Sequence, residues 1–550
     1  MALVFLVIIL STLVTLVGSS TAGAPTITVG LIATTFTTDQ TGNLVSSPVG
    51  AQHLAAFMLA VDEINTSPEY HVKIRPEVSL GNVDYVQTIQ NPSYDGAAAA
   101  RDIFLSANPQ AVIVADTTTK ALSAASALQT LEIPTIFSAA RSCALSHANN
   151  YPEVMRMTAS LSHDGAILRY ICRHFGWSRV AVINSEDDFG VDTFFVFKTQ
   201  EMDGDTGEPI KILAQESFPA NKKDISKEVA YLRASGATIF VALISKATSM
   251  ALFLVHGHRA GVFHSGTQVL SACQESNAAV LAEVQKLLRP SESIDDVLKG
   301  LMSVQLYPQE HLTTARGKDF LSRYLALEPT LKYTANGRPS CTFAEANRTI
   351  EHSKYPLYKV PKYPDVCTGI SSFTALSPLD PDILLTYDAV YALAKALHYL
   401  FSVAHYTNSS AHLNGHLFEI LVTNTTNRLS IHGASGTLKW YEGYAKAENF
   451  GQGERTSGHS YKILNYFPAS LLASTGVNTD GGLAFVGYFN GTTDFSTNKN
   501  KFIDVASETL SVTSGKLSVT SGNNRNAEDA IVFCVKVSLT LTLNPDLTLT

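Results

Sequence analysis

The 550-residue sequence carries little charge of either sign. Only 16% of its residues are charged and the formal net charge is -8, so neither a nucleic-acid surface nor a polybasic membrane patch is indicated. None of its six cysteines has the CxxC spacing of a zinc site, and GxSxG, HExxH and phosphate-loop motifs are absent. We therefore expect no metal, no cofactor, no nucleic-acid partner and no enzymatic activity.

Long apolar runs are also scarce. Residues 1–17 form one, and the small residues at 18–23 after it predict a signal peptide over 1–23. An uncleaved anchor is the alternative, because no Lys or Arg precedes the run. No later run reaches the roughly 20 residues that a membrane helix needs, and 530–543 is short and contains Lys536. We expect export without a stop-transfer helix.

Export has two chemical consequences. An oxidising environment makes the cysteines candidates for disulfides rather than metal ligands. Sequons for N-glycosylation fit a secreted eukaryotic product, and they begin at Asn65, Asn347, Asn408, Asn424 and Asn490.

Strand-like and helix-like segments alternate along most of the chain. The β-branched segment 26–33 is followed by an amphipathic helical pattern over 51–65, and a second alternating series runs from 164 to 245. A long helical pattern returns at 387–404. This alternation predicts two α/β domains, each with a mostly parallel sheet flanked by helices. From about Ser507 the composition becomes simple, with LSVTSG at 510 and again at 517, which predicts linker or disorder in a low-complexity tail over 501–550.

Four segments together resemble a known receptor family. They are AVDEIN at the end of the first helix, 151–190, YDAVYALAKAL at 387–397, and the run 431–468. In this order they resemble the ligand-binding region of class C G-protein-coupled receptors, receptor guanylate cyclases and type I periplasmic binding proteins, over roughly 26–495. Cys341 and VCTGISSF at 366–373 resemble the glutamate-receptor branch.

The resemblance implies a Venus flytrap, in which two lobes are joined by three crossings of the chain. It places these crossings near Ala159, Pro308 and His432. The expected first lobe is 24–161 with 309–429, including an insertion at 329–378, and the expected second lobe is 162–308 with 430–500.

Candidate ligand-binding residues follow predicted strands of the first lobe, where loops and helix starts expose backbone donors. They are Thr117, Thr118 and Thr119, then Ser138, Ala139 and Ala140. A hydroxyl cluster at a helix start suits an anion, although one threonine could simply be an N-cap.

The resemblance adds roles to these positions and extends the site to the second lobe. Thr118 matches a carboxylate contact, Ser138 with Ala140 an amino-group wall, Phe189 an aromatic from the opposite lobe, and His53 a cationic position. The sequence departs from the family pattern at three positions, Leu161, Ala272 and Asp382. Leu161 and Ala272 stand where the family has carboxylates, so the ammonium of an amino-acid ligand would lack a carboxylate partner. A buried unpaired ammonium is costly, so we expect an anionic or neutral polar ligand.

The remaining cysteines, histidines and acidic residues have simpler interpretations. The resemblance implies a disulfide between Cys341 and Cys367. Cys172 and Cys273 are expected to be buried thiols, whereas Cys143 and Cys534 stay open. Capping or solvated side chains are favoured over a metal site for His256, His258 and His264. A solvated loop is favoured over a cation site for Glu186, Asp187 and Asp188.

The predicted function is the extracellular ligand-binding module of a cell-surface receptor that resembles G-protein-coupled receptors. A soluble secreted solute-binding protein and a receptor guanylate cyclase ectodomain remain alternatives, and a secreted hydrolase has little support. The expected partners are a small molecule, a membrane through a downstream segment absent from this chain, and a second subunit. The resemblance implies homo- or heterodimers through first-lobe helices at 95–107 and 120–131.

Overall fold

A computed structural model describes most of both lobes. The described residues are 25–34, 36–38, 44–46, 48–70, 72–79, 92–146, 150–199, 209–264, 266–306, 312, 314–326, 330–331, 366–367, 380, 382–403, 417–418, 420, 431–440, 459–466, 479–480, 483–494, 499–504, 507–513 and 516–522.

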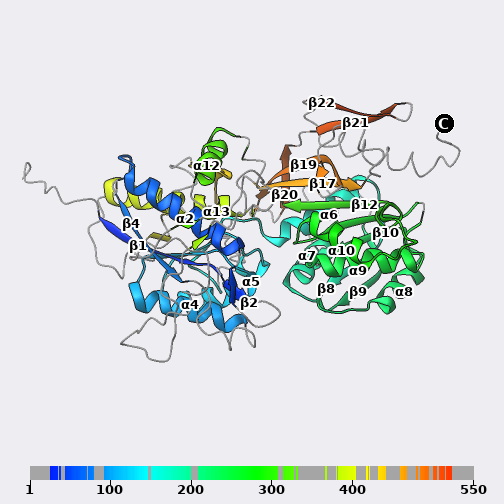
Figure 1. The fold of residues 1–550 in the computed structure, drawn as a ribbon, viewed down its shortest axis with the longest axis horizontal. Helices are drawn as coiled ribbons and strands as arrows, with labels where there is room; N and C mark the ends of the chain where they lie inside the picture. The colour runs from blue at the N-terminus through cyan, green and yellow to red at the C-terminus, as the bar shows by residue number, and fades with distance from the viewer. Residues whose placement is uncertain are drawn as a thin grey trace, which may run out of the picture.

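The first lobe, drawn on the left in Figure 1, is built on a parallel sheet in the order β4-β1-β5-β6-β7. Its strands are β1 (Thr26–Ile32), β4 (Lys73–Ser79), β5 (Ala111–Val114), β6 (Thr135–Phe137) and β7 (Val154–Arg156). Its helices are α2 (Pro48–Thr66), α4 (Pro92–Ala107), α5 (Thr118–Gln129), α12 (Ala315–Leu325) and α13 (Ile383–His398). One apolar core joins the sheet to α2 and α13 and a second joins it to α4 and α5, so both faces are covered.

The second lobe contains a mixed sheet in the order β18-β19-β17-β12-β11-β10-β8-β9, with β20 beside β19. Its strands are β8 (Arg179–Ser185), β9 (Lys211–Phe218), β10 (Ile239–Leu243), β11 (Gln268–Ala272), β12 (Leu301–Leu306), β17 (His459–Tyr466), β18 (Thr479–Asp480), β19 (Leu483–Asp494) and β20 (Lys499–Asp504). Its helices are α6 (Leu161–His174), α7 (Asp188–Thr199), α8 (Ser226–Ala234), α9 (Ala247–Arg259), α10 (Asn277–Leu287) and α11 (Ile294–Leu298). Strands β8 to β12 pair in parallel, whereas β17 to β20 add antiparallel edges.

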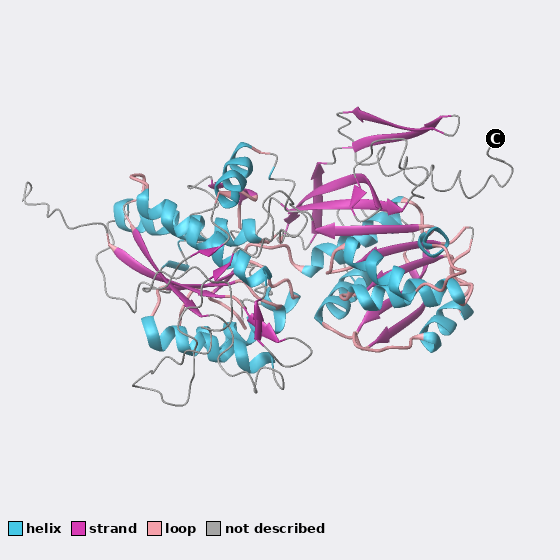
Figure 2. Ribbon diagram, viewed as in Figure 1, coloured by secondary structure: helices cyan, strands magenta, loops and turns pink. Residues whose placement is uncertain are grey.

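Short elements complete the described chain (Figure 2). They are β2 (Phe36–Thr38) with β3 (Leu44–Ser46), the 3-10 turn Cys143–Ser146, β13 (Thr330–Leu331) with β14 (Val366–Cys367), the π-helical turn Tyr399–Val403, and β15 (Ile431–Gly433) with β16 (Gly436–Leu438).

The predicted α/β fold with two lobes is confirmed, and the chain passes between the lobes more than once, although Pro308 lies outside the described residues. Met157 packs in the first-lobe core while Ala159 packs in the second. Strand β12 ends in the second lobe at Leu306, and Phe320 of α12 packs back in the first. The chain therefore builds its first lobe from separated segments, which explains why α12 and α13 come so late.

The third crossing lies later than expected. Ile431, Leu438 and Trp440 all pack in the first-lobe core, so the chain leaves this lobe after Trp440 rather than near His432. The reason is an anchor from α13. The fully buried Asp388 carboxylate accepts hydrogen bonds from Ala434 N at 2.7 Å, Ser435 N at 2.7 Å and Ser435 Oγ at 2.5 Å. A Cβ on Gly433 would collide with this carboxylate, which explains the glycine there.

The described part of the predicted tail forms strands where a linker is expected. Residues 510–513 of the first LSVTSG repeat lie in β21 (Ser507–Thr513) and the second repeat, 517–522, lies in β22 (Lys516–Gly522). These two strands pair antiparallel with Leu510 opposite Val519. The reason is that alternating apolar and hydroxyl side chains, although simple in composition, have the two-residue period of a strand.

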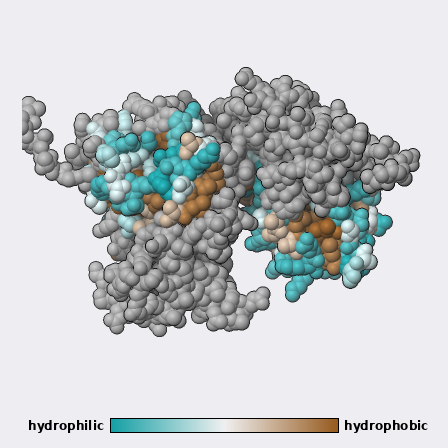
Figure 3. All heavy atoms as spheres, turned by 45° about the horizontal axis from the view of Figure 1, so that its top comes forward, coloured by the Kyte–Doolittle hydropathy of each residue, from teal (hydrophilic) through white to brown (hydrophobic). Residues whose placement is uncertain are grey.

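Two further expectations concern membranes and export. Among the helices in the described ranges, none is long and apolar enough to cross a bilayer. The predicted signal peptide lies outside the described residues. Hydrophilic residues cover much of the described surface of both lobes on the face drawn in Figure 3, with apolar areas between them.

Replacing Asp388 by Asn should destabilise the protein by about 2 kcal/mol, because hydrogen bonds to a charged acceptor are lost and an amide would face three donors. Chemical denaturation measures the free energy of unfolding. The exposed Asp62 of α2 is the control, and Asp62→Asn should change it by less than about 0.5 kcal/mol. Equal effects of the two substitutions would contradict an anchoring role for Asp388.

Candidate functional site

The carboxyl edge of the first-lobe sheet gathers polar groups from loops after two strands. Thr34 follows β1 and its hydroxyl donates to the Asp116 carboxylate, which follows β5. Lys120 Nζ donates to Thr34 Oγ1 at 2.5 Å and lies 3.9 Å from Asp116 Oδ2. The lysine charge is therefore already matched within this edge.

Helix α5 begins at this edge with the three predicted threonines. Thr117 is the N-cap residue, yet its side chain makes no capping hydrogen bond. Thr117 and Thr119 are exposed and Thr118 is half-buried. The simple N-cap interpretation therefore does not hold for Thr117. The helix start keeps hydroxyls at the surface beside backbone donors that favour negative or polar acceptor groups.

A buried polar line lies behind this edge. His53 Nδ1 is 2.7 Å from Thr386 Oγ1, and Thr386 Oγ1 donates to Ser138 Oγ at 2.7 Å. All three residues are buried, while Ala139 beside them is half-buried. Two predicted site residues, His53 and Ser138, thus meet through Thr386 of α13. The sequence did not single out Thr386, although a threonine between the apolar residues 383–385 and the predicted helix 387–404 is a usable signal.

His53 does not supply a fixed positive charge. Burial lowers its pKa below the ordinary 6.5, and the nearby carboxylates of Asp380 and Asp116 only partly oppose this. Its Nε2 lies 3.8 Å from Asp380 Oδ1. This lowered pKa favours the neutral imidazole at pH 7, whereas the resemblance implies a cationic position.

Two carboxyl groups border the same line at the start of α13. Asp382 N donates to Asp380 Oδ1 at 2.8 Å, and Asp380 N donates to Gln52 Oε1 at 2.7 Å. Burial, followed by the negative charge of Asp380, raises the pKa of Asp382 well above its usual range. Two acidic residues therefore lie at this border. The sequence singled out only Asp382, and the structure adds Asp380.

The facing loops of the second lobe are organised by one carboxylate. Asp187 accepts from Ser185 Oγ at 2.8 Å and from Gly190 N at 3.0 Å, and it also accepts from Ser245 Oγ. It joins the loops after β8 and β10 and caps the start of α7. Its neighbours Glu186 and Asp188 are exposed, as expected for a solvated loop.

Two predicted ligand-binding residues of the second lobe, Phe189 and Ala272, lie in its apolar core. Phe189 is 4% exposed and Ala272 is 1% exposed, and both belong to the apolar core that also contains Leu161. Their side chains are thus covered by the second-lobe core, whereas the resemblance assigned them to ligand-binding positions. Helix α7 turns Phe189 inward because the first turn must cover the sheet.

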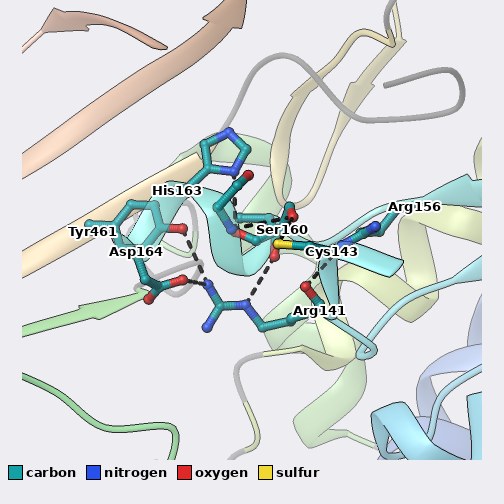
Figure 4. A network of polar contacts seen from close by, with 9 residues as sticks. Arg141, Cys143, Arg156, Ser160, His163, Asp164 and Tyr461 are labelled. Atoms are coloured by element: carbon teal, nitrogen blue, oxygen red, sulfur yellow. Dashed lines mark hydrogen bonds and ion pairs between the residues drawn. The ribbon is translucent and has the colours of Figure 1, made fainter. Parts of the chain in front are cut away.

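The first crossing connects the lobes through a compact polar network (Figure 4). Arg141, which follows Ala140, forms an ion pair with Asp164 of α6 and donates from Nη2 to Tyr461 OH at 3.2 Å. The predicted wall at 138–140 therefore continues directly into contacts with the second lobe.

Comparison with protein families gives a match over residues 52–266, to the family described as receptor family ligand binding region. Residues 52–266 belong to this family. The matched segment runs from α2 past α9 and contains Asp116 and Lys120 of the first-lobe edge, the start of α5 and the first crossing. No curated protein matches the chain.

The cysteines with described side chains follow the expectation for buried thiols at positions 172 and 273. Cys172 and Cys273 are buried free thiols, and burial raises the pKa of Cys273 to about 12. Cys143 is also free and half-buried. The predicted Cys341 to Cys367 pair and Cys534 lie outside the residues whose side chains are described.

Two further residues of the receptor family segment, a candidate metal ligand and a sequon asparagine, have structural partners. His256 lies 3.8 Å from Asp224 Oδ1, and no group of three metal-ligating side chains occurs among the described residues. Asn65 donates to Ile74 O at 2.8 Å and accepts from Ile74 N at 2.8 Å, which gives this sequon residue a role in holding β4. The side chains of the other sequon asparagines are not described.

Phe189→Ala should lower the free energy of unfolding by about 3 to 5 kcal/mol, because it empties a large core position. Phe195 lies in the same helix but is 64% exposed, so Phe195→Ala should cost far less. Urea denaturation of both variants measures the difference. A harmless Phe189→Ala would show that the ring is not part of the core.

His163 should make stability depend on pH. Burial lowers its pKa from 6.5 to about 4, so the folded protein holds it neutral while the unfolded chain protonates it. Stability is therefore lost as pH falls from about 6.5 towards 4, by about 3 kcal/mol for this group. His163→Gln should flatten that part of the profile, and the exposed His264→Gln should leave it unchanged. Identical profiles for the wild type and His163→Gln would contradict this assignment.

Proposed function

We propose that this chain is the extracellular ligand-binding module of a cell-surface receptor, and that it binds a small molecule between its lobes without converting it. The single observation that carries this proposal is the match of residues 52–266 to the receptor ligand-binding family. The polar edge of the first lobe supports it, because ligands of open α/β sheets bind beyond the carboxyl ends of the strands.

Signalling would follow from lobe closure. A molecule that touches both lobes binds the closed arrangement more tightly, and only this difference in affinity shifts the population. The proposed output resembles that of a G-protein-coupled receptor. A secreted solute-binding protein or a receptor guanylate cyclase ectodomain would use the same closure. Dimer formation through α4 and α5 belongs to this proposal as well.

The charges of the edge favour a neutral polar or anionic group at the start of α5. Backbone donors and the exposed hydroxyls of Thr117 and Thr119 suit such a group. The positive charges nearby are already matched, since Lys120 meets Asp116 and Arg141 meets Asp164. Strong binding of a multiply charged anion is therefore disfavoured. Asp380 at the other border suits hydrogen-bond donors of the ligand.

A ligand screen followed by one substitution tests the proposal. Free amino acids, short dicarboxylates and neutral sugars are added separately to the whole chain, and a rise in unfolding temperature marks binding. For any ligand found, Thr118→Val should weaken the affinity about tenfold in calorimetric titration, because a hydrogen bond at the helix start is lost.

Ser126→Val is the matched control, since Ser126 is an exposed hydroxyl of the same helix away from its start. This variant should bind as the wild type does. Equal affinities of Thr118→Val and the wild type would remove the start of α5 from the site. Conversion of the ligand during incubation would overturn the assignment as a binding module.

A further inference from the structure

The segment 141–143 holds the two lobes together immediately after the predicted ligand wall. Each of its three residues contacts the second lobe or the crossing to it. The wall residue Ala140 is directly bonded to Arg141, so any displacement of the wall moves this segment too.

The guanidinium of Arg141 reaches across the crossing. It pairs with Asp164 in the first turn of α6, and Nη2 also donates to Tyr461 OH of β17 at 3.2 Å. Its Nε donates to Ala159 O, in the crossing itself, at 3.0 Å. The side chains of the ion pair are 8% and 3% exposed, so water screens the attraction little.

The backbone carbonyl of Arg141 accepts two further hydrogen bonds. It accepts from Leu161 N, at the start of α6, at 2.9 Å. The same carbonyl accepts from Arg156 Nη1 of β7 at 2.9 Å. One residue thus joins the first-lobe strand β7, the crossing, α6 and β17, as Figure 4 shows.

The next two residues contact a second helix of the same lobe. Ser142 Oγ donates to Asp192 Oδ2 at 3.0 Å, and Cys143 N donates to the same oxygen at 2.8 Å. Asp192 belongs to α7, which packs closely on α6: a Cβ on Gly165 of α6 would lie 2.6 Å from Thr193 O. The two acidic contacts therefore sit on one rigid helix pair.

From this geometry we infer that Arg141 is a positioning residue, which sets the orientation of the lobes through Asp164 and Tyr461 and couples it to the ligand wall. This rests on the proposed function, since lobe orientation matters only if a ligand uses it. Arg141 itself touches no ligand in this scheme. Separating the charges of a buried ion pair without new partners is strongly unfavourable, so this pair resists a change in the orientation of the lobes.

Distances between the lobes, measured without ligand, test the inference. Fluorophores are attached through non-natural residues at the exposed positions 126 of α5 and 227 of α8 in the full chain. Arg141→Gln and Asp164→Asn should each raise, at least about fivefold, the fraction of molecules whose interlobe distance differs from the main distance of the wild type. The double variant should match either single variant, because the pair acts as one unit.

Two further variants separate positioning from folding. Tyr461→Phe keeps the buried ring and removes only the hydroxyl that Arg141 contacts, so it should fold and still shift the distances at least about twofold. Arg259→Gln breaks an ion pair with Glu292 within the second lobe and should leave the distances unchanged.

Unchanged distances in folded Arg141→Gln or Tyr461→Phe protein, or shifts that simply add in the double variant, would overturn the inference. If Arg141→Gln does not fold, the Tyr461→Phe result decides. Because no ligand is present, a failed ligand screen leaves this test intact, and a failed distance test leaves the binding proposal standing.

Discussion

A parallel sheet must be covered on both faces, because every crossover between its strands lays a helix against it. In the first lobe, α4 and α5 come from these crossovers and cover one face. The other face is covered by α2 together with α13, and the chain supplies α13 only after building most of the second lobe. The repeated crossing between lobes is thus a consequence of covering one apolar face with a distant segment.

The same constraint positions the polar groups. Parallel strands end at one shared edge, so residues after β1, β5 and β6 meet there although they are distant in sequence. Once α13 covers the sheet, its Thr386 reaches Ser138 and His53. Its Asp388 meanwhile fastens the hairpin at 431–438. One helix therefore completes both the core and the polar line behind the edge.

Buried charge is concentrated where segments from different parts of the chain meet. Asp388 is matched by backbone donors and Arg141 by a carboxylate, a hydroxyl and a carbonyl. Leaving either charge without partners would be costly, so these contacts allow few alternative arrangements. Such buried charges determine the orientation in which two segments pack. Apolar side chains mainly determine that the segments pack at all.

The sequence by itself determined the two α/β lobes and the position of Thr118 and Ser138 at strand ends, because strand and helix periods and chain order are local properties. Tertiary structure alone decided that Phe189 faces the core, that Thr386 meets His53, and that residues 431–440 stay with the first lobe. Each of these depends on which distant segment covers a given face. Periodicity shows that a side chain is apolar or polar, but the partner that it meets is chosen only when the separated segments pack together.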